Sequence, residues 1–254
     1  MNHPMKILII VGTRPNFIKI TQFERAFNQY PGRFEYTLIH TGQHYDANMS
    51  DVFFSQFRLK EPDVYLDVKG LNPGQQVGEI IIQLSRIMQE NRPDLVMVVG
   101  DVNSTLAGAI AANKNGILLA HLESGLRSGD RSMPEEINRI LTDSITDVFF
   151  VTEQSGLDHL QKELHREGKV FFVGNTMIDT LIAFDKEIQA NPVLENLGLH
   201  PKGYCVMTMH RPQNVDSSEG LEKLLEIIKS IPTDLHVVFP IHPRTKLSLE
   251  RHGF

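Results

Sequence analysis

The chain has 254 residues, of which 41% are hydrophobic, so it is long enough to form one large domain or two modest ones, each with a hydrophobic core. Its 25 basic and 31 acidic residues give a formal net charge of −6 without a run of like charges, which argues against a nucleic-acid-binding surface. The single cysteine, Cys205, cannot form a disulfide within the chain, and this favours a reducing compartment such as the cytoplasm. The apolar stretches are too short to cross a bilayer, so we expect no membrane association.

Six short apolar runs predict the strands of one parallel sheet. Taken in chain order, the expected strands are residues 6–12, 34–40, 94–100, 116–122, 147–152 and 169–174. Segments of helical periodicity lie between them, and the expected helices are Asn16–Tyr30, Gln75–Asn91, Thr105–Asn115, Pro134–Ser144 and Glu153–Arg166. This alternation is typical of βα units around a sheet that is buried on both faces, so the fold class is predicted as α/β and doubly wound.

A second domain is predicted after the sixth strand, where "VGNTMID" leads through Gly174 into a new helix. Beyond it we expect strands at residues 204–210 and 235–240 and a helix at Ser217–Ser230. Two strands are too few for an independent sheet, which usually has roughly five or six. The sequence therefore predicts an N-terminal Rossmann-like domain at residues 1–173 and a partial, apparently truncated, C-terminal Rossmann-like domain at 174–254.

Polar residues follow the predicted strands at the edge where open α/β sheets bind ligands. They are residues 12–15, residues 41–44, Asp101, Glu123 and, in the second domain, His210 with Arg211. Their convergence on one edge favours a binding or catalytic site. Each residue also has a local structural alternative. Asp101 suits a helix cap, Glu135 could pair with Ser132 in a capping box, and His44 and His210 could be hydrogen-bonded structural histidines.

The segment "GTRPNFIK" has the features of a phosphate site. Arg14 offers a planar fork of donors, Pro15 suits the first turn of a helix, and Lys19 lies about one turn further on. The sequence contains neither G-x-G-x-x-G nor the Walker-type G-x-x-x-x-G-K-[ST], so we expect no nicotinamide cofactor and no P-loop chemistry. It also lacks H-E-x-x-H and paired cysteines, which argues against a structural or catalytic zinc and leaves only a weakly held Mg²⁺ open.

Six collinear motifs carry a resemblance to a known family. They are "GTRPNFIK", "HTGQHYD", "VVGDVNST", "HLESGLRSGDRSMPEEINR", "VGNTMIDT" and "TMHRPQN". In order and spacing the chain resembles the non-hydrolysing UDP-N-acetylglucosamine (UDP-GlcNAc) 2-epimerases. The resemblance implies a GT-B-like architecture, in which two Rossmann-like domains flank a central cleft. It also implies interconversion of UDP-GlcNAc and UDP-N-acetylmannosamine (UDP-ManNAc) for surface polysaccharide synthesis, no cofactor, and a homodimer.

The resemblance assigns roles to ten residues. Those that match catalytic positions are Asp101, Glu123, Glu135 and His210. Those that match substrate-binding positions are Arg14, Lys19, Arg139 and Arg211. Gln43 and His44 match a region that holds a second UDP-GlcNAc as allosteric activator. The chain departs from the family pattern at Asn16, where many members have glutamate, and at Ser124, where alanine is common. It also has a short 129–134 loop, and "GLNPGQQ" offers no arginine for an activator.

The implied reaction explains the density of charge in residues 121–139. The C2 proton of an N-acetylhexosamine is too weakly acidic for direct removal, so the C1–O bond must break first, with UDP as leaving group. The resulting 2-acetamidoglucal needs acid–base groups on both faces of the ring and cations on the diphosphate. The alternatives are a GT-B glycosyltransferase, a non-catalytic UDP-sugar-binding fragment, and a hydrolysing epimerase.

Overall fold

A computed structural model of the protein describes residues 3–42, 54–66, 68, 70–163 and 169–254. The chain divides into two compact units, Met1–Asp185 and Lys186–Phe254. No helix in these described ranges is both long enough and apolar enough to span a membrane.

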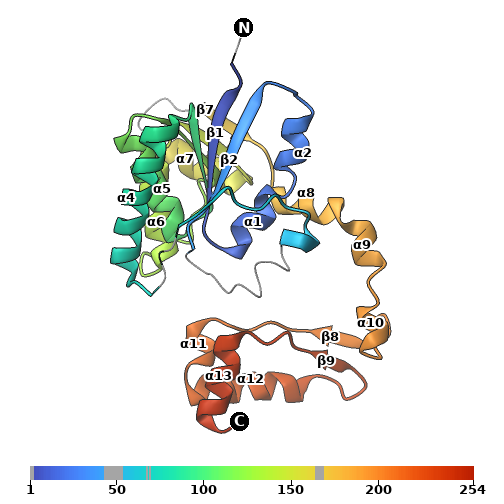
Figure 1. The fold of residues 1–254 in the computed structure, drawn as a ribbon. Coiled ribbons are helices and arrows are strands. Elements are labelled where there is room, and N and C mark those ends of the chain that lie inside the picture. Colours follow the sequence, from blue (N-terminus) through green and yellow to red (C-terminus); the bar gives the residue numbers. More distant parts are fainter. Residues whose placement is uncertain (1–2, 43–53, 67, 69, 164–168) are drawn as a thin grey trace. The chain divides into compact units, whose positions relative to one another are not determined.

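The first unit is built on a parallel sheet of seven strands in the order β3-β2-β1-β4-β5-β6-β7 (Figure 1). The strands are β1 Met5–Val11, β2 Phe34–His40, β3 Val64–Tyr65, β4 Leu95–Val99, β5 Leu118–Ser124, β6 Val148–Val151 and β7 Lys169–Phe172. The six strands predicted from the sequence are confirmed, and within the described residues of this unit the two-residue edge strand β3 is the one addition. Because β1 lies between β2 and β4, the chain reverses its winding direction there, and open α/β sheets bind ligands at such a point.

Helices cover both faces of this sheet. They are α1 Arg14–Ile20, α2 Phe23–Asn28, α4 Pro73–Asn91, α5 Asn103–Lys114, α6 Pro134–Ile145, α7 Gln154–Glu163 and α8 Thr176–Ala183. The single helix expected over Asn16–Tyr30 was wrong, because the chain breaks into α1 and α2 near Thr21. At the break, the Thr21 and Thr180 hydroxyls lie 2.5 Å apart, and Thr180 belongs to α8. This is a tertiary contact, which local periodicity does not report.

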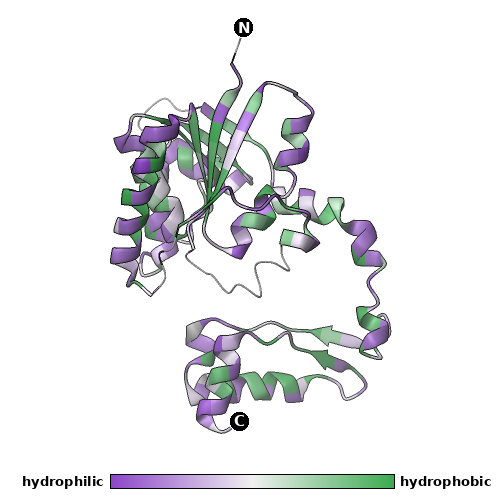
Figure 2. Cartoon of the chain, in the orientation of Figure 1, coloured by the Kyte–Doolittle hydropathy of each residue, from purple (hydrophilic) through white to green (hydrophobic). Residues whose placement is uncertain are grey.

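Two hydrophobic clusters fill the spaces between the sheet and its helices. Leu8 and Ile10 point to the face covered by α4 and α5, whereas Ile7, Ile9 and Val11 point to the face covered by α1. β1 is thus apolar on both faces, as a parallel sheet between two helical layers requires. Figure 2 shows the same arrangement, with hydrophobic strands inside and hydrophilic residues on the outer faces of the helices.

Gly108 lets α5 approach the sheet closely. A Cβ built there would lie only 2.8 Å from Cδ1 of Ile10 and 2.9 Å from Cγ1 of Val98. Such contacts are well inside van der Waals distance, so a larger residue would push α5 outwards. The position of α5 bears on the site because Asp101 lies in the short turn that joins the end of β4 to the start of α5.

The second unit is smaller and contains a two-stranded parallel sheet. Its elements are α9 Asp185–Gln189, α10 Val193–Asn196, β8 Tyr204–Val206, α11 Pro212–Val215, α12 Ser218–Ser230, β9 His236–Val238 and α13 Pro243–His252. Both strands expected here are present, although shorter than expected, and the helix predicted at Ser217–Ser230 is α12. The buried core of the second unit is formed by Val215, Leu221 and Leu224.

The compact units divide after Asp185, which is later than the boundary predicted after residue 173. The difference arises because α8 packs on α1 and therefore belongs to the first unit. The Thr180 hydroxyl donates to the carbonyl oxygen of Ile18 at 2.6 Å and also contacts Thr21. The hydrogen bonds of one buried threonine thus tie this helix to the first unit.

Candidate active site

Four of the predicted site residues form one charged cluster at the carboxyl edge of the sheet. Asp101 follows β4, Glu123 lies near the end of β5, Lys19 is on α1 and Arg139 is on α6. Lys19 Nζ lies 2.7 Å from Glu123 Oε2. Nη2 of Arg139 lies 2.6 Å from Asp101 Oδ2 and 3.1 Å from Glu123 Oε1. Four separate parts of the chain therefore bring two carboxylates and two cations together.

The cluster is largely buried and electrically balanced. The side chains of Lys19, Arg139 and Glu123 are 9%, 11% and 13% exposed, whereas that of Asp101 is 29% exposed. Two positive and two negative groups compensate one another, which is what allows charges to be buried. Asp101 is the member most accessible to a ligand. Within the described residues, Nε of Arg139 is buried and has no hydrogen-bond partner.

An unusual backbone conformation places Glu123 in the cluster. Its φ is 73°, in the left-handed region, and the pairing of β5 with β6 shifts register between Leu122 and Ser124. For a residue other than glycine this conformation costs about 1–3 kcal/mol, and such strain is commonly found at functional sites. The irregularity lies at the end of β5, beside the ion pairs of Glu123.

Gly100 provides the space that the cluster needs at the end of β4. Its φ is 71°, and a Cβ built there would lie 3.2 Å from Asn16 Nδ2 and 3.4 Å from Lys19 Nζ. A side chain at this position would be strained by the backbone and would crowd the amide of Asn16. We therefore regard glycine as required at this turn.

Two asparagines support the cluster and were not predicted as site residues. Asn16 Oδ1 accepts hydrogen bonds from the backbone N–H of Gly12 at 3.0 Å and of Thr13 at 3.1 Å, and its Nδ2 donates to the carbonyl of Val99 at 3.1 Å. Asn138 Nδ2 donates to the carbonyl of Asp101 at 3.0 Å. Each had a partial signal in the sequence, because Asn16 stands where many members of the resembled family have glutamate and Asn138 directly precedes Arg139. The side-chain amide of asparagine can both donate and accept hydrogen bonds, which explains why asparagine suits position 16.

The start of α6 is held by Glu136 rather than by Glu135. Glu136 is 5% exposed, and its carboxylate accepts from the Ser128 backbone N–H at 2.7 Å, the Ser128 hydroxyl at 3.0 Å and the Gly129 N–H at 3.1 Å. The capping box considered for Ser132 and Glu135 was wrong, because Met133 is the N-cap and Ser132 bonds to Asp130. Burial acts to raise the pKa of Glu136, but the hydrogen bonds from Ser128 and Gly129 and the charge of Arg127 outweigh it, so the pKa is lowered.

We expect Glu136→Gln to reduce the free energy of unfolding by about 1.5 kcal/mol at neutral pH, because a charge-assisted set of hydrogen bonds is lost. A carboxyl group with a lowered pKa stabilises the fold above its ordinary value of 4.5 and loses that contribution as pH falls through the lowered value. The difference between the two proteins should therefore close on acidification. Urea unfolding between neutral pH and about pH 3 measures it. Glu135→Gln, at the exposed neighbouring position, is the control and should show no such dependence.

The remaining predicted residues lie outside this cluster. Arg14 is exposed at the first position of α1, and Glu135 is exposed in the first turn of α6 without a hydrogen bond or ion pair to the cluster within the described ranges. His210 and Arg211 are exposed in the second unit, where the His210 ring lies 5.6 Å from that of His242. The predicted activator residues, Gln43 and His44, lie outside the described residues.

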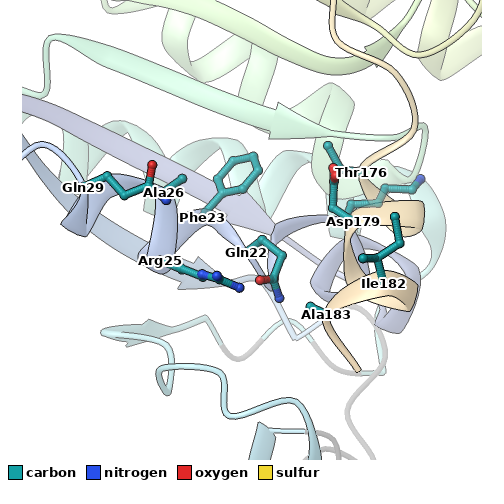
Figure 3. Close-up of a pocket in the computed structure, with 10 residues that line it drawn as sticks. Gln22, Phe23, Arg25, Ala26, Gln29, Thr176, Asp179, Ile182 and Ala183 are labelled. Carbon is teal, nitrogen blue, oxygen red and sulfur yellow. The ribbon is translucent and has the colours of Figure 1, made fainter. Parts of the chain in front are cut away.

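A cavity of about 430 Å³ opens beside Lys19 in the first unit. Figure 3 shows Gln22, Phe23 and Arg25 on one side of it and Asp179 and Ile182 of α8 on the other. Within the described part of the chain, Lys19 is the only member of the charged cluster that lines it. The same ranges contain no group of three histidine, cysteine, aspartate or glutamate residues arranged to hold a metal ion.

Comparisons with known proteins identify the family. The family profile described as UDP-N-acetylglucosamine 2-epimerase matches residues 25–252. The chain is 40% identical to a UDP-N-acetylglucosamine 2-epimerase homolog of Methanococcus maripaludis, over 98% of this chain and 68% of that protein. It is equally similar, at 40% identity over 98% of this chain and 70% of the relative, to UDP-2,3-diacetamido-2,3-dideoxy-D-glucuronate 2-epimerase of Pseudomonas aeruginosa.

A solved structure agrees with these relatives. The crystal structure of Methanocaldococcus jannaschii UDP-GlcNAc 2-epimerase in complex with UDP-GlcNAc and UDP has a TM-score of 0.85 and 38% identity, covering 98% of this chain and 69% of that one. The fold is thus α/β and GT-B-like, as predicted. The parallel sheet, the charged cluster at its winding reversal and the match over nearly the whole sequence lead to one conclusion: the chain belongs to the UDP-N-acetylglucosamine 2-epimerase family.

Proposed function

We propose that the protein reversibly converts UDP-GlcNAc to UDP-ManNAc by eliminating UDP and adding it back across a 2-acetamidoglucal intermediate. The observation that carries the proposal is the buried cluster of Asp101, Glu123, Lys19 and Arg139 at the carboxyl edge of the sheet. Its two carboxylates supply groups that take up and release protons, and its two cations supply charge for a departing diphosphate.

The elimination requires a base for the C2 proton and stabilisation of negative charge on UDP. As the C1–O bond breaks, C1 becomes electron-poor and the C2 proton becomes acidic enough for a carboxylate to remove. We assign this proton transfer to Glu123, which is held in place by Lys19 at 2.7 Å and Arg139 at 3.1 Å. Re-addition of a proton to the opposite face of C2 inverts that centre, and we assign this step to Asp101 or Glu135.

The leaving group needs positive charge and hydrogen-bond donors. The unpartnered Nε–H of Arg139 is one such donor inside the cluster. Arg14, exposed at the start of α1, is a second candidate for the diphosphate. His210 and Arg211 are proposed as further substrate ligands from the second unit, on the basis of the motif they share with the family.

A second substrate should be tested directly, because the relative named for it is 40% identical to this chain. The Pseudomonas aeruginosa relative is named for a UDP-2,3-diacetamido-2,3-dideoxy-D-glucuronate substrate. This sugar has an additional acetamido group at C3 and a carboxylate on C5, while the chemistry at C1 and C2 is the same. The charged cluster therefore suits both substrates, and discrimination depends on contacts to C3 and C5.

The proposal is tested by incubating the full-length protein with UDP-GlcNAc in D₂O and following the sugar by NMR. Deuterium at C2 and the appearance of the manno isomer, without any acceptor, are the expected results. UDP release that requires an acceptor would instead identify a glycosyltransferase, and free ManNAc would identify a hydrolysing epimerase. A parallel reaction with the diacetamido glucuronate shows which substrate is used faster.

We further propose, from the family resemblance, that the protein is a cytoplasmic homodimer supplying surface polysaccharide synthesis. Activation by a second UDP-GlcNAc near Gln43 and His44 belongs to the same set of proposals. Size-exclusion chromatography with light scattering tests the dimer, and the dependence of the rate on UDP-GlcNAc concentration tests the activation.

A further inference from the structure

His121 is buried with a hydrogen-bond acceptor at each ring nitrogen. The residue is 0% exposed. Its Nε2 lies 2.7 Å from the carbonyl oxygen of Gly100, and its Nδ1 lies 2.7 Å from Oδ1 of Asp143. A carbonyl oxygen can only accept, so Nε2 must carry a hydrogen. The second contact therefore also holds a proton, either on the ring or on the carboxyl group.

Two further hydrogen bonds to Asp143 favour its ionised form and therefore a proton on the ring. Asp143 is 2% exposed, and its Oδ2 accepts from the backbone N–H of Gly125 at 3.0 Å and from Arg127 Nη1 at 2.7 Å. Burial acts to raise the pKa of Asp143, but the charges and hydrogen bonds of His121 and Arg127 outweigh it and lower the pKa. Arg127 in turn pairs with the exposed Glu163 at 2.6 Å.

The same two side chains hold both turns that carry the carboxylates of the cluster. Asp143 contacts the ring of His121, which precedes Glu123 in the chain, and the backbone N–H of Gly125, which follows it. Its carboxylate therefore spans the irregular end of β5. His121 binds the carbonyl of Gly100, the residue before Asp101, while the Gly100 N–H donates to Leu122 of β5 at 3.0 Å. Neither side chain belongs to the charged cluster.

The geometry points to His121 and Asp143 as a positioning pair in which His121 carries a proton on both ring nitrogens. The pair holds Glu123 in its left-handed conformation and keeps the turn from Gly100 to Asp101 against β5. The catalytic consequence rests on the proposed epimerase function, whereas the protonation of the ring does not. The two parts can therefore fail separately.

The protonation is tested by NMR on the 254-residue chain with ¹⁵N-labelled histidine. At neutral pH the His121 ring should show a hydrogen on both nitrogens, and a bare Nδ1 would overturn the inference. In Asp143→Asn the amide can donate to Nδ1, so the ring should become neutral with a hydrogen on Nε2 only. The signals of His121 are assigned among the eleven histidines by comparison with His121→Gln or, if that variant does not fold, by through-bond correlation to the backbone.

The positioning role is tested by kinetics of the full-length protein. Asp143→Asn should lower kcat by about a hundredfold, the effect of a small displacement of catalytic groups, with KM changed only a few-fold because Lys19 and Arg139 remain. Asp147→Asn is the matched control, since Asp147 accepts from the Leu119 N–H at 2.9 Å at the other end of β5. Equal kcat values for the two variants would overturn the positioning role. An unmodified protein without epimerase activity would refute the proposed function and leave the NMR result to decide the protonation.

Discussion

Glu123→Gln in the full-length protein is expected to abolish exchange of the substrate's C2 proton with solvent while leaving UDP binding largely intact. Glutamine has nearly the same shape as glutamate and still accepts a hydrogen bond, but it cannot take up the proton. Loss of a positioned acid–base group lowers a rate by about 10²–10⁴-fold. The measurement is deuterium incorporation at C2 by NMR, with UDP affinity from calorimetry on the same samples.

The control for this experiment is Glu90→Gln, which removes the same charge at an exposed position on α4. It should exchange the C2 proton at the unmodified rate. Undiminished exchange in Glu123→Gln would remove Glu123 from the mechanism, whereas loss of UDP binding in that variant would show that its effect is structural.

The second large effect is expected for Arg139→Met, which should lower the free energy of unfolding of the first unit by about 3 kcal/mol. Arg139 contacts both Asp101 and Glu123, and removing one partner of a buried ion pair leaves an uncompensated charge. We place the value at the low end for buried pairs because the Asp101 side chain is 29% exposed and can be partly solvated. Urea unfolding followed by circular dichroism measures it.

A double variant distinguishes lost charge compensation from lost packing. In Arg139→Met, Glu123 keeps its ion pair with Lys19, whereas Asp101 loses Arg139. Adding Asp101→Asn removes that uncompensated charge, so the double variant should be more stable than Arg139→Met alone. Lys60→Met is the control in the same unit, because Lys60 pairs with Asp63 at a similar distance of 2.6 Å but at 39% and 33% exposure. A loss in Lys60→Met as large as that in Arg139→Met would contradict the role of burial.

The main architecture could be predicted because its signals are local. Apolar runs such as those of β1 and β4 are hydrophobic on both faces, and this pattern occurs where helices cover both sides of a parallel sheet. The polar residues that follow such strands must lie at one edge, so Asp101 and Glu123 could be named as neighbours. The two-residue strand β3 was missed because so short a run has no detectable periodicity.

The details of the site could not be predicted because they depend on approach between distant segments. Glu135 and Glu136 are adjacent in the first turn of α6, yet only Glu136 binds the preceding loop. The rotation of α6 about its axis decides which of the two side chains points inward, and a shift by one residue position would exchange them. The break at Thr21 has the same origin, since it accompanies a contact with Thr180 of α8.

By itself the sequence determined the α/β class, six of the seven strands of the first unit and the family, and it named the four charged residues, because hydrophobic periodicity and collinear motifs are properties of the chain alone. Only the tertiary structure decided that Arg139 bridges Asp101 and Glu123, that Glu123 adopts a positive φ, and that Asp143 spans this irregularity. Ion pairs and buried hydrogen bonds act over a few ångströms between elements far apart in sequence, so their partners are fixed only when the helices pack on the sheet.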